Sequence, residues 1–283
     1  ALATASNIGV QTRLVSAATS FNANMRIKIL TSLQQDILQE TSFFNLLEER
    51  WKDGNVTIVT DGYYDLLHII GVSTPTVIRN LQQEKSKLIP IAYSPLGTIA
   101  PWSKASFPKT LGKYVAWHAC GKHEYEYLQQ QFTQTTITWL KNPVTTTGLT
   151  MAEFASAMQG FYQEVLDHHE EYVWHMMHQR MSQLHLQEEQ HTLCQVLQQI
   201  LYVEYKFKRK QILSSNIEEL GRLMHETNYD EDELAKNLQL LKVHGFMASL
   251  EQVMEERQLL SEGFMPIPPL QNRLTKNINK TIV

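Results

Sequence analysis

The absence of helix breakers over the central part of this chain limits its fold more than any other feature. Neither glycine nor proline occurs between Gly160 and Gly221, and all 283 residues include only 12 glycines and 9 prolines. Both residues interrupt helices, and multi-stranded folds need them in their many turns. The shortage predicts a mainly α-helical protein, made of helical bundles or hairpins, with at most a small two-stranded β element in its N-terminal part.

Apolar residues recur at helical spacing from Thr150 to Leu213. A single helix over this stretch would be about 95 Å long at about 1.5 Å per residue, several times the diameter of a domain. We therefore expect the polar segment 178–190 to fold it into a hairpin, with a projecting coiled-coil arm as the alternative. Three capping pairs mark expected helix starts: Thr150 with Glu153, Ser215 with Glu218, and Asp230 with Glu233. With Gly245 and Gly263 as helix ends, they predict helices near 216–227, 231–244 and 246–262.

The remaining breakers divide the chain. Six glycines and prolines fall between Ile89 and Gly112, which is typical of a connector between modules. β-rich runs occur at 56–59 and 88–93, and a helix is expected over 24–39. The predicted parts are an N-terminal mainly helical module (1–88), a packed Pro/Gly-rich connector (89–112), a helical body (113–263) and an extended basic tail containing prolines (264–283).

Cysteine content and hydropathy bear on the compartment. Cys120 and Cys194 are the only cysteines, and neither belongs to a CxxC pair, which favours a reducing compartment and predicts a cytoplasmic protein. No apolar run reaches the roughly 18 residues of a membrane span.

The segment 65–81, DLLHIIGVSTPTVIRNL, resembles the helix-turn-helix of LacI-type bacterial repressors. Gly71 permits a tight turn, Ser73 can cap a second helix, and Pro75 is tolerated in its first turn. Residues 66–123 hold seven lysines and arginines and one acidic residue, Glu84. The resemblance implies a DNA-binding transcriptional regulator, the first alternative, with candidate DNA contacts at Thr74, Thr76, Arg79, Lys85 and Lys87.

Histidine is concentrated in one region, because six of the eleven lie between His168 and His191. Glu188 and His191 have the Glu-x-x-His spacing of di-iron helical bundles, and two histidines three residues apart share a helix face. A metal-binding helical enzyme is therefore the second alternative, against a solvated helix face. Its candidate ligands are His175, His178, Glu188 and His191.

The sequence contains no nucleophile elbow, Walker A loop or dinucleotide-binding glycine motif. We therefore expect no cofactor, identify no small-molecule substrate, and favour an interaction protein over an enzyme. The leading hypothesis is a helical protein–protein interaction subunit or adaptor of a larger, bacterial assembly, with other protein subunits as partners and nucleic acid as the alternative. Candidate partner-binding residues are Trp102, Phe107, Arg273, Lys276 and Lys280.

Overall fold

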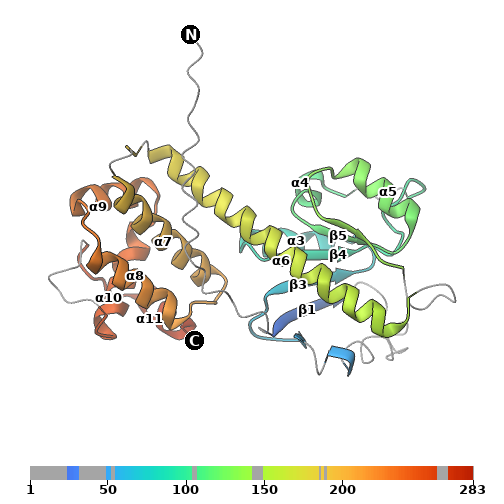
Figure 1. The fold of residues 1–283 in the computed structure, drawn as a ribbon, viewed down its shortest axis with the longest axis horizontal. Helices are drawn as coiled ribbons and strands as arrows, with labels where there is room; N and C mark the ends of the chain where they lie inside the picture. The colour runs from blue at the N-terminus through green and yellow to red at the C-terminus, as the bar shows by residue number, and fades with distance from the viewer. Residues whose placement is uncertain are drawn as a thin grey trace, which may run out of the picture.

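The computed structural model consists of two lobes joined by one long helix (Figure 1). The sheet lobe holds six described strands with helices α3, α4 and α5, and the helical lobe holds α7 to α11. Helix α6 (Met151–Met181) runs through both lobes and contributes to both cores. The structure describes residues 24–31, 49–51, 55–103, 107–141, 149–184, 186–187, 190–259 and 267–282.

The six strands form one parallel sheet in the order β2-β1-β3-β4-β5-β6. The expectation of a mainly helical bundle with at most two strands is therefore wrong, because the fold is α/β. The inner strands β3, β4 and β5 are buried on both faces, so their apolar residues run continuously and lack the alternation that marks a half-buried strand. The strands are β1 (Met25–Thr31), β2 (Val56–Val59), β3 (Leu66–Ile70), β4 (Ile91–Ser94), β5 (Ala116–Ala119) and β6 (Ile137–Trp139).

Helices cover both faces of the sheet. Helices α3 (Pro75–Ser86), α4 (Lys109–Gly112) and α5 (Lys122–Gln131) lie on one face, whose core includes the stacked rings of Tyr93 and Trp117. The first half of α6 covers the other face, where Phe161 packs against short side chains such as Ala92 and Ala116. Such double coverage is the usual arrangement for parallel sheets.

Two segments of the N-terminal part differ from the expected helices. Residues 25–31 of the helix expected over 24–39 form β1, and residues 32–39 lie outside the described residues. In the helix-turn-helix-like segment the expected first helix is strand β3, whereas Gly71 does make a turn, with φ of 110°, and Thr74 caps α3. The segment 89–112, expected to connect two modules, contains β4 and α4 and lies inside the sheet lobe.

The helical lobe follows local sequence signals closely. Thr150 and Glu153 form the capping box of α6, and the chain reverses after the 3-10 turn Ser182–Leu184, within the segment predicted to fold back. Asp230 caps its helix as predicted, whereas Ser215 lies inside a helix whose N-cap is Leu213. The described helices of this lobe are α7 (His191–Lys208), α8 (Ser214–Glu226), α9 (Glu231–Leu240), α10 (His244–Glu256) and α11 (Arg273–Thr281). None of the helices in the described ranges is both long enough and apolar enough to cross a membrane.

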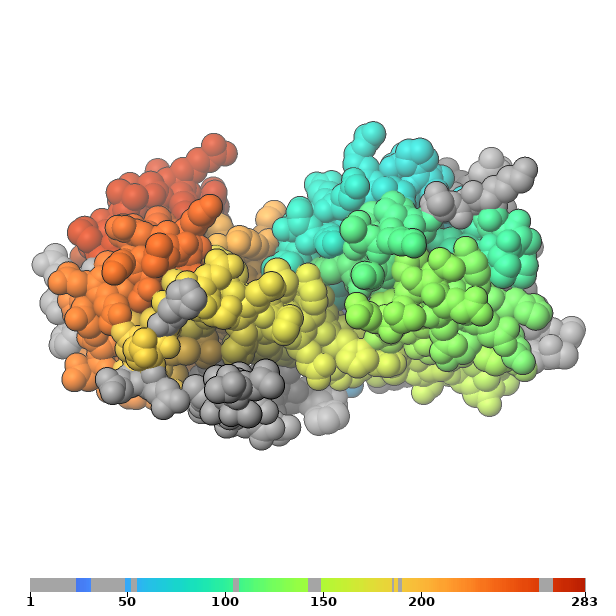
Figure 2. Space-filling view, turned by 90° about the horizontal axis from the view of Figure 1, so that it is seen from above, coloured from blue at the N-terminus to red at the C-terminus, as the bar shows by residue number. Residues whose placement is uncertain are grey.

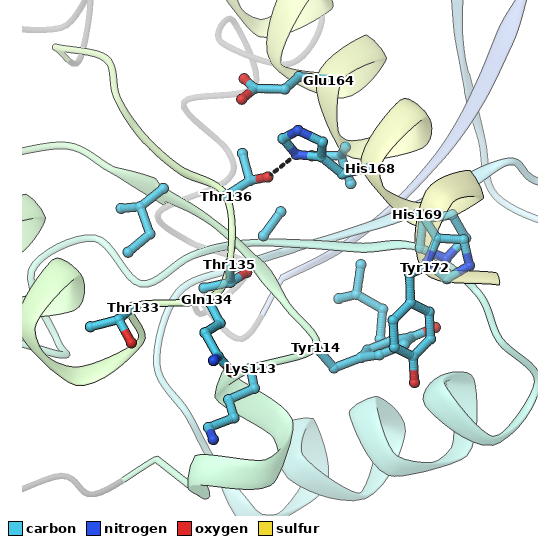
Figure 3. Close-up of a pocket in the computed structure, with 15 residues that line it drawn as sticks. Lys113, Tyr114, Thr133, Gln134, Thr135, Thr136, Glu164, His168, His169 and Tyr172 are labelled. Carbon is cyan, nitrogen blue, oxygen red and sulfur yellow. Dashed lines mark hydrogen bonds between the residues drawn. The ribbon is translucent and has the colours of Figure 1, made fainter. Parts of the chain in front are cut away.

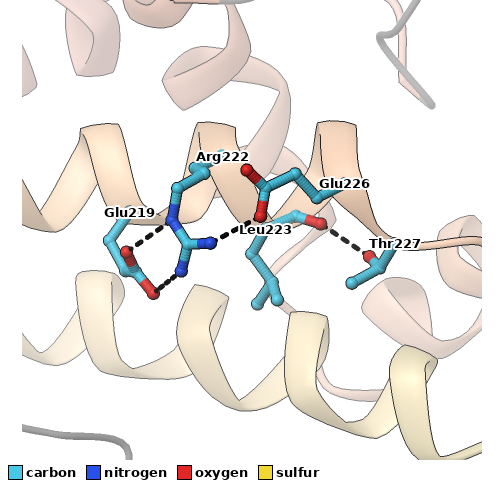
Figure 4. Close-up of polar contacts among 5 residues, drawn as sticks. All are labelled: Glu219, Arg222, Leu223, Glu226 and Thr227. Carbon is cyan, nitrogen blue, oxygen red and sulfur yellow. Dashed lines mark hydrogen bonds and ion pairs between the residues drawn. The ribbon is translucent and has the colours of Figure 1, made fainter.

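Polar groups on the surface and in the core of this lobe differ in their partners. On the exposed side of α8, Arg222 pairs with Glu219 at 2.7 Å and with Glu226 at 2.5 Å (Figure 4). In the core, Glu251 of α10 is fully buried, and neither carboxylate oxygen makes a hydrogen bond of normal geometry with a described residue. Burial raises the pKa of Glu251 to about 8, which the nearby N–H of Ile267 only partly opposes.

Residues 267–282 of the predicted basic tail pack on their own lobe. Asn272 caps α11, and its side-chain amide donates to Ser249 of α10 at 3.0 Å. Ile267 and Ile278 are buried in the core of the helical lobe. The described part of the tail therefore ends in a docked helix, where an extended segment was expected.

Candidate functional site

A cavity of about 560 Å³ lies between the amino-terminal ends of β4, β5 and β6 and one side of α6 (Figure 3). A volume of this size is typical of small-molecule sites. Hydrogen-bonding side chains make up most of the lining: Lys113, Tyr114, Thr133, Gln134, Thr135, Thr136, Glu164, His168, His169 and Tyr172.

The turn before β5 places Lys113 and Tyr114 at the cavity. This turn needs a glycine at position 112, because a Cβ atom there would lie 2.0 Å from Cε1 of Phe132. The hydroxyl of Tyr114 donates to the carbonyl of Ile89 at 2.7 Å, and burial raises its pKa well above the usual value. Tyr114 is therefore a neutral, fixed wall of the cavity.

The segment 133–136 forms the opposite wall and is held against β5. The N–H of Trp117 donates to the carbonyl of Thr136 at 2.8 Å, and the hydroxyl of Thr135 donates to the carbonyl of Val115. These bonds place three threonines and Gln134 along one side of the cavity.

Helix α6 contributes a stripe of polar residues, Glu164, His168 and Tyr172, which are spaced by four and therefore share one helix face. All three are exposed to solvent in part. Nδ1 of His168 lies 2.5 Å from the hydroxyl oxygen of Thr136, so one hydrogen bond ties the helix to the strand side.

His169 borders the cavity beside this stripe and is neutral. Its Nε2 donates to the carbonyl of Leu88 at 2.8 Å. Burial, reinforced by the charge of Arg209, lowers the pKa of His169 to about 3, although the bond to Leu88 acts in the opposite direction. The ring of Tyr114 meets His169 and Tyr172 edge-on at 5.8 and 5.6 Å.

The charges of the cavity are separated. Lys113 lies at one end of the lining and Glu164 at the other, with the threonines and His168 between them (Figure 3). A ligand with one anionic and one cationic group would therefore meet an opposite charge at each end.

A second polar group lies deeper, between the sheet and α6. Nδ1 of His68 is 2.8 Å from the hydroxyl of Tyr162, and its Nε2 is 2.7 Å from Oγ of Ser94. Ser94 Oγ is also 2.7 Å from Nδ1 of His118, whose Nε2 is 3.3 Å from the carbonyl of Leu140. All four side chains are at least 97% buried.

Only one placement of the hydrogen atoms gives every contact in this chain of side chains a donor and an acceptor. The carbonyl of Leu140 can only accept, so His118 carries its hydrogen on Nε2 and accepts from Ser94 at Nδ1. Ser94 must then accept from Nε2 of His68, which leaves Nδ1 of His68 to accept from Tyr162. Burial lowers the pKa of His68 to about 3 and that of His118 to about 4, in agreement with two neutral rings. The chain joins β3, β4, β5 and α6 into one unit.

The candidate metal ligands do not converge in the described part of the chain. His175 and His178 are exposed on α6, where Nδ1 of His178 bonds to the carbonyl of Trp174. His191 begins α7 and contacts Gln195, and Glu188 lies outside the described residues. No group of three or more described residues is arranged to hold a metal ion.

The candidate DNA contacts are divided between exposed and occupied side chains. Thr76 and Arg79 are exposed on α3, whereas Thr74 caps that helix. Lys85 donates to the carbonyl of Thr110, and Lys87 pairs with Glu84. Binding of DNA by this helix stays a prediction.

The candidate partner-binding residues also differ in exposure. Trp102 is 66% exposed, but Phe107 is buried in the core of the sheet lobe, against the rings of Tyr93 and Trp117. Arg273, Lys276 and Lys280 are exposed on α11. Docking of another protein subunit at these exposed residues stays a prediction.

Sequence reasoning singled out the histidine-rich region but missed the cavity as a unit. The spacing of Glu164, His168 and Tyr172 was the available signal on α6. Lys113 and Thr136 come from the turns before two strands, and only the fold places them beside this helix. Comparison with known proteins finds no matching family model, no matching curated protein and no matching solved structure.

Proposed function

We propose that this protein binds a small zwitterion, such as a free amino acid or a dipeptide, in the cavity beside α6. The observation that carries the proposal is the separation of Lys113 and Glu164 across one cavity of about 560 Å³. The ammonium of Lys113 would pair with the ligand carboxylate, and Glu164 with its ammonium.

The neutral groups support the same ligand. Threonine hydroxyls and the amide of Gln134 offer hydrogen bonds to a peptide or carboxylate group. The rings of Tyr114 and Tyr172 offer an apolar surface for the ligand side chain. Because Tyr114 and His169 are fixed by hydrogen bonds, this part of the site is formed before a ligand arrives.

Isothermal titration calorimetry with amino acids and dipeptides tests the proposal. We expect acetate and methylamine, which carry one charge each, to bind at least about tenfold more weakly than the zwitterions. Lys113→Gln and Glu164→Gln should each weaken zwitterion binding by about tenfold, because each leaves one ligand charge unpaired.

Two exposed residues outside the cavity lining provide matched controls. Lys122→Gln and Glu171→Gln remove the same charges from α5 and α6 and should leave the affinity within about twofold of the original. Absence of zwitterion binding, or equal losses in the control variants, would overturn the proposal.

A further inference from the structure

Three basic side chains meet tyrosine rings where the two lobes join. Nζ of Lys85, near the end of α3, lies 5.4 Å from the ring centroid of Tyr114. Near the end of α7, Nζ of Lys206 lies 5.1 Å from the ring of Tyr202 and 5.8 Å from that of Tyr205.

Arg209 completes this cluster and bridges the lobes. Its guanidinium carbon lies 5.4 Å from the ring centroid of Tyr205, whose hydroxyl accepts from Nη1 at 2.5 Å. Nη2 donates to the backbone carbonyl of Asp65 in the sheet lobe at 2.9 Å. The N–H on Nε is buried and meets no acceptor among the described residues.

The three cations lack the ion pairs that their neighbours make. Lys87, two residues after Lys85, pairs with Glu84 at 2.7 Å, and Lys208, two residues after Lys206, pairs with Glu204 at 2.8 Å. By contrast, Lys85, Lys206 and Arg209 form no ion pair within the ranges that the structure describes.

The pKa of Lys206 shows that nearby carboxylates only partly neutralise the positive charge of this cluster. Burial and then the charge of Arg209 lower the pKa of Lys206 to about 8, although Glu170 and Asp65 act in the opposite direction. The charges of Glu170 and Asp65 therefore do not compensate for the burial of this lysine and for the neighbouring guanidinium.

The surface has a hollow where the two lobes join (Figure 2), and none of the three cations belongs to the lining of the cavity. Figure 2 shows this hollow between the α3 side of the sheet lobe, in cyan, and the helical lobe, in orange and red, with the end of α7 at its base. Tyr114 separates the two sites, because one side of its ring meets Tyr172 and His169 of the cavity while Lys85 lies against its face.

We propose that Lys85, Lys206 and Arg209 form a binding site for the phosphate group of a small phosphorylated molecule. A phosphate dianion matches neighbouring cations such as Lys206 and Arg209, which both lie against the ring of Tyr205, and it accepts hydrogen bonds from hydroxyl donors as well. Burial raises the pKa of Tyr202 and of Tyr205, so both hydroxyls keep their hydrogens and remain donors. The bound dianion would supply the negative charge that the described carboxylates do not.

Thermal unfolding with increasing inorganic phosphate, at ionic strength held constant with sodium chloride, tests this site. We expect a saturable rise in Tm for the natural sequence. Lys206→Gln and Lys85→Gln, changed in different lobes, should each weaken phosphate binding by at least about tenfold. Lys208→Gln and Lys87→Gln remove the same charge nearby and should stay within about twofold.

Two further readouts distinguish this site from general charge effects and from the cavity. Phosphate affinity should rise as the pH falls from about 9 to about 7.5, because Lys206 gains its proton there while phosphate stays mainly a dianion. Lys113→Gln should leave phosphate binding unchanged, since Lys113 belongs to the cavity. An equal Tm rise with chloride alone, or equal losses in the Lys206 and Lys208 variants, would overturn the proposal.

Discussion

The two lobes bury polar side chains in opposite ways. In the sheet lobe, His68, Ser94 and His118 form a hydrogen-bonded chain in which each ring nitrogen has a partner. In the helical lobe, Glu251 is equally buried, yet its oxygens make no hydrogen bond of normal geometry with a described residue. A buried polar group costs little when it is paired and several kcal/mol when it is not, so we expect the lobes to respond differently to pH and to mutation.

Acid should weaken the sheet lobe selectively, and this is the largest effect we expect. The folded pKa values of His68, His118 and His169 are about 3, 4 and 3, below the value of about 6.5 in an unfolded chain. The unfolded chain therefore binds more protons below pH 6.5, and stability falls as the pH drops from there towards 4. At about pH 4.5 each histidine should cost about 2 kcal/mol.

The stability contribution of Glu251 depends on pH in the opposite direction, so the two lobes can be told apart by their response to pH. Its folded pKa of about 8 lies above the unfolded value, so its contribution is complete at low pH and is lost as the pH rises through 8. Urea unfolding at about pH 7 and about pH 4.5 should show a larger loss by tryptophan fluorescence than by helical circular dichroism. Four of the five tryptophans, Trp51, Trp102, Trp117 and Trp139, belong to the sheet lobe, and only Trp174 packs against the core of the helical lobe. Equal shifts in both signals would contradict a difference between the lobes.

A buried serine in each lobe tests the hydrogen-bonded chain itself. Ser94→Ala would leave Nε2–H of His68 without an acceptor and Nδ1 of His118 without a donor, so we expect a loss of about 3 kcal/mol. Ser249→Ala in α10 removes a bond to the carbonyl of Gly245 and a bond accepted from the side-chain amide of Asn272. Because Asn272 is partly exposed and its amide can bond to water, the substitution should cost only about 1 kcal/mol. Chemical denaturation of both variants at neutral pH measures the difference. Equal losses of stability would show that the buried hydrogen-bonded chain contributes no more than a local hydrogen bond in a helix.

The same division explains which parts of the fold could be predicted from the sequence. Helix starts at Thr150 and Asp230 depend on side chains three residues away, and no proline interrupts the long helices α6 and α7, so local patterns were sufficient in the helical lobe. The sheet depends on parallel pairing between distant segments, such as Ile27 with Leu66 and Leu67 with Ile91. Its buried strands carry no alternation, and β1 begins with Met25, Ile27 and Ile29 in a run that also fits a helix.

In the candidate sites, too, local patterns in the sequence were visible and contacts between distant segments were not. His168 was noticed because it belongs to a local cluster, whereas its partner Thr136 comes from the loop before β6 and is brought to α6 only by the sheet. Lys206 and Arg209 belong to a basic run at the end of α7, and in the sequence a favourable interaction with the helix dipole is a sufficient explanation for such a run. Their distinguishing feature is the position of α7 against Asp65 and the tyrosines, which no local pattern encodes.

The smallest effect we expect comes from the unpaired carboxyl group, and it should depend on pH. Glu251→Gln keeps the side-chain shape and removes the ionisation, so stability should rise by about 2 kcal/mol at about pH 6, where the glutamate is charged in the unfolded chain and must take up a proton to fold. At about pH 4.5 the gain should fall below about 0.5 kcal/mol, because the glutamate is then protonated in the folded protein and about half protonated in the unfolded chain. Glu218→Gln, on the exposed side of α8, removes the same charge and should show no such pH dependence. Urea unfolding at both pH values measures the gain, and a gain that does not change with pH would mean that Glu251 meets its charge-stabilising partner in the folded protein after all.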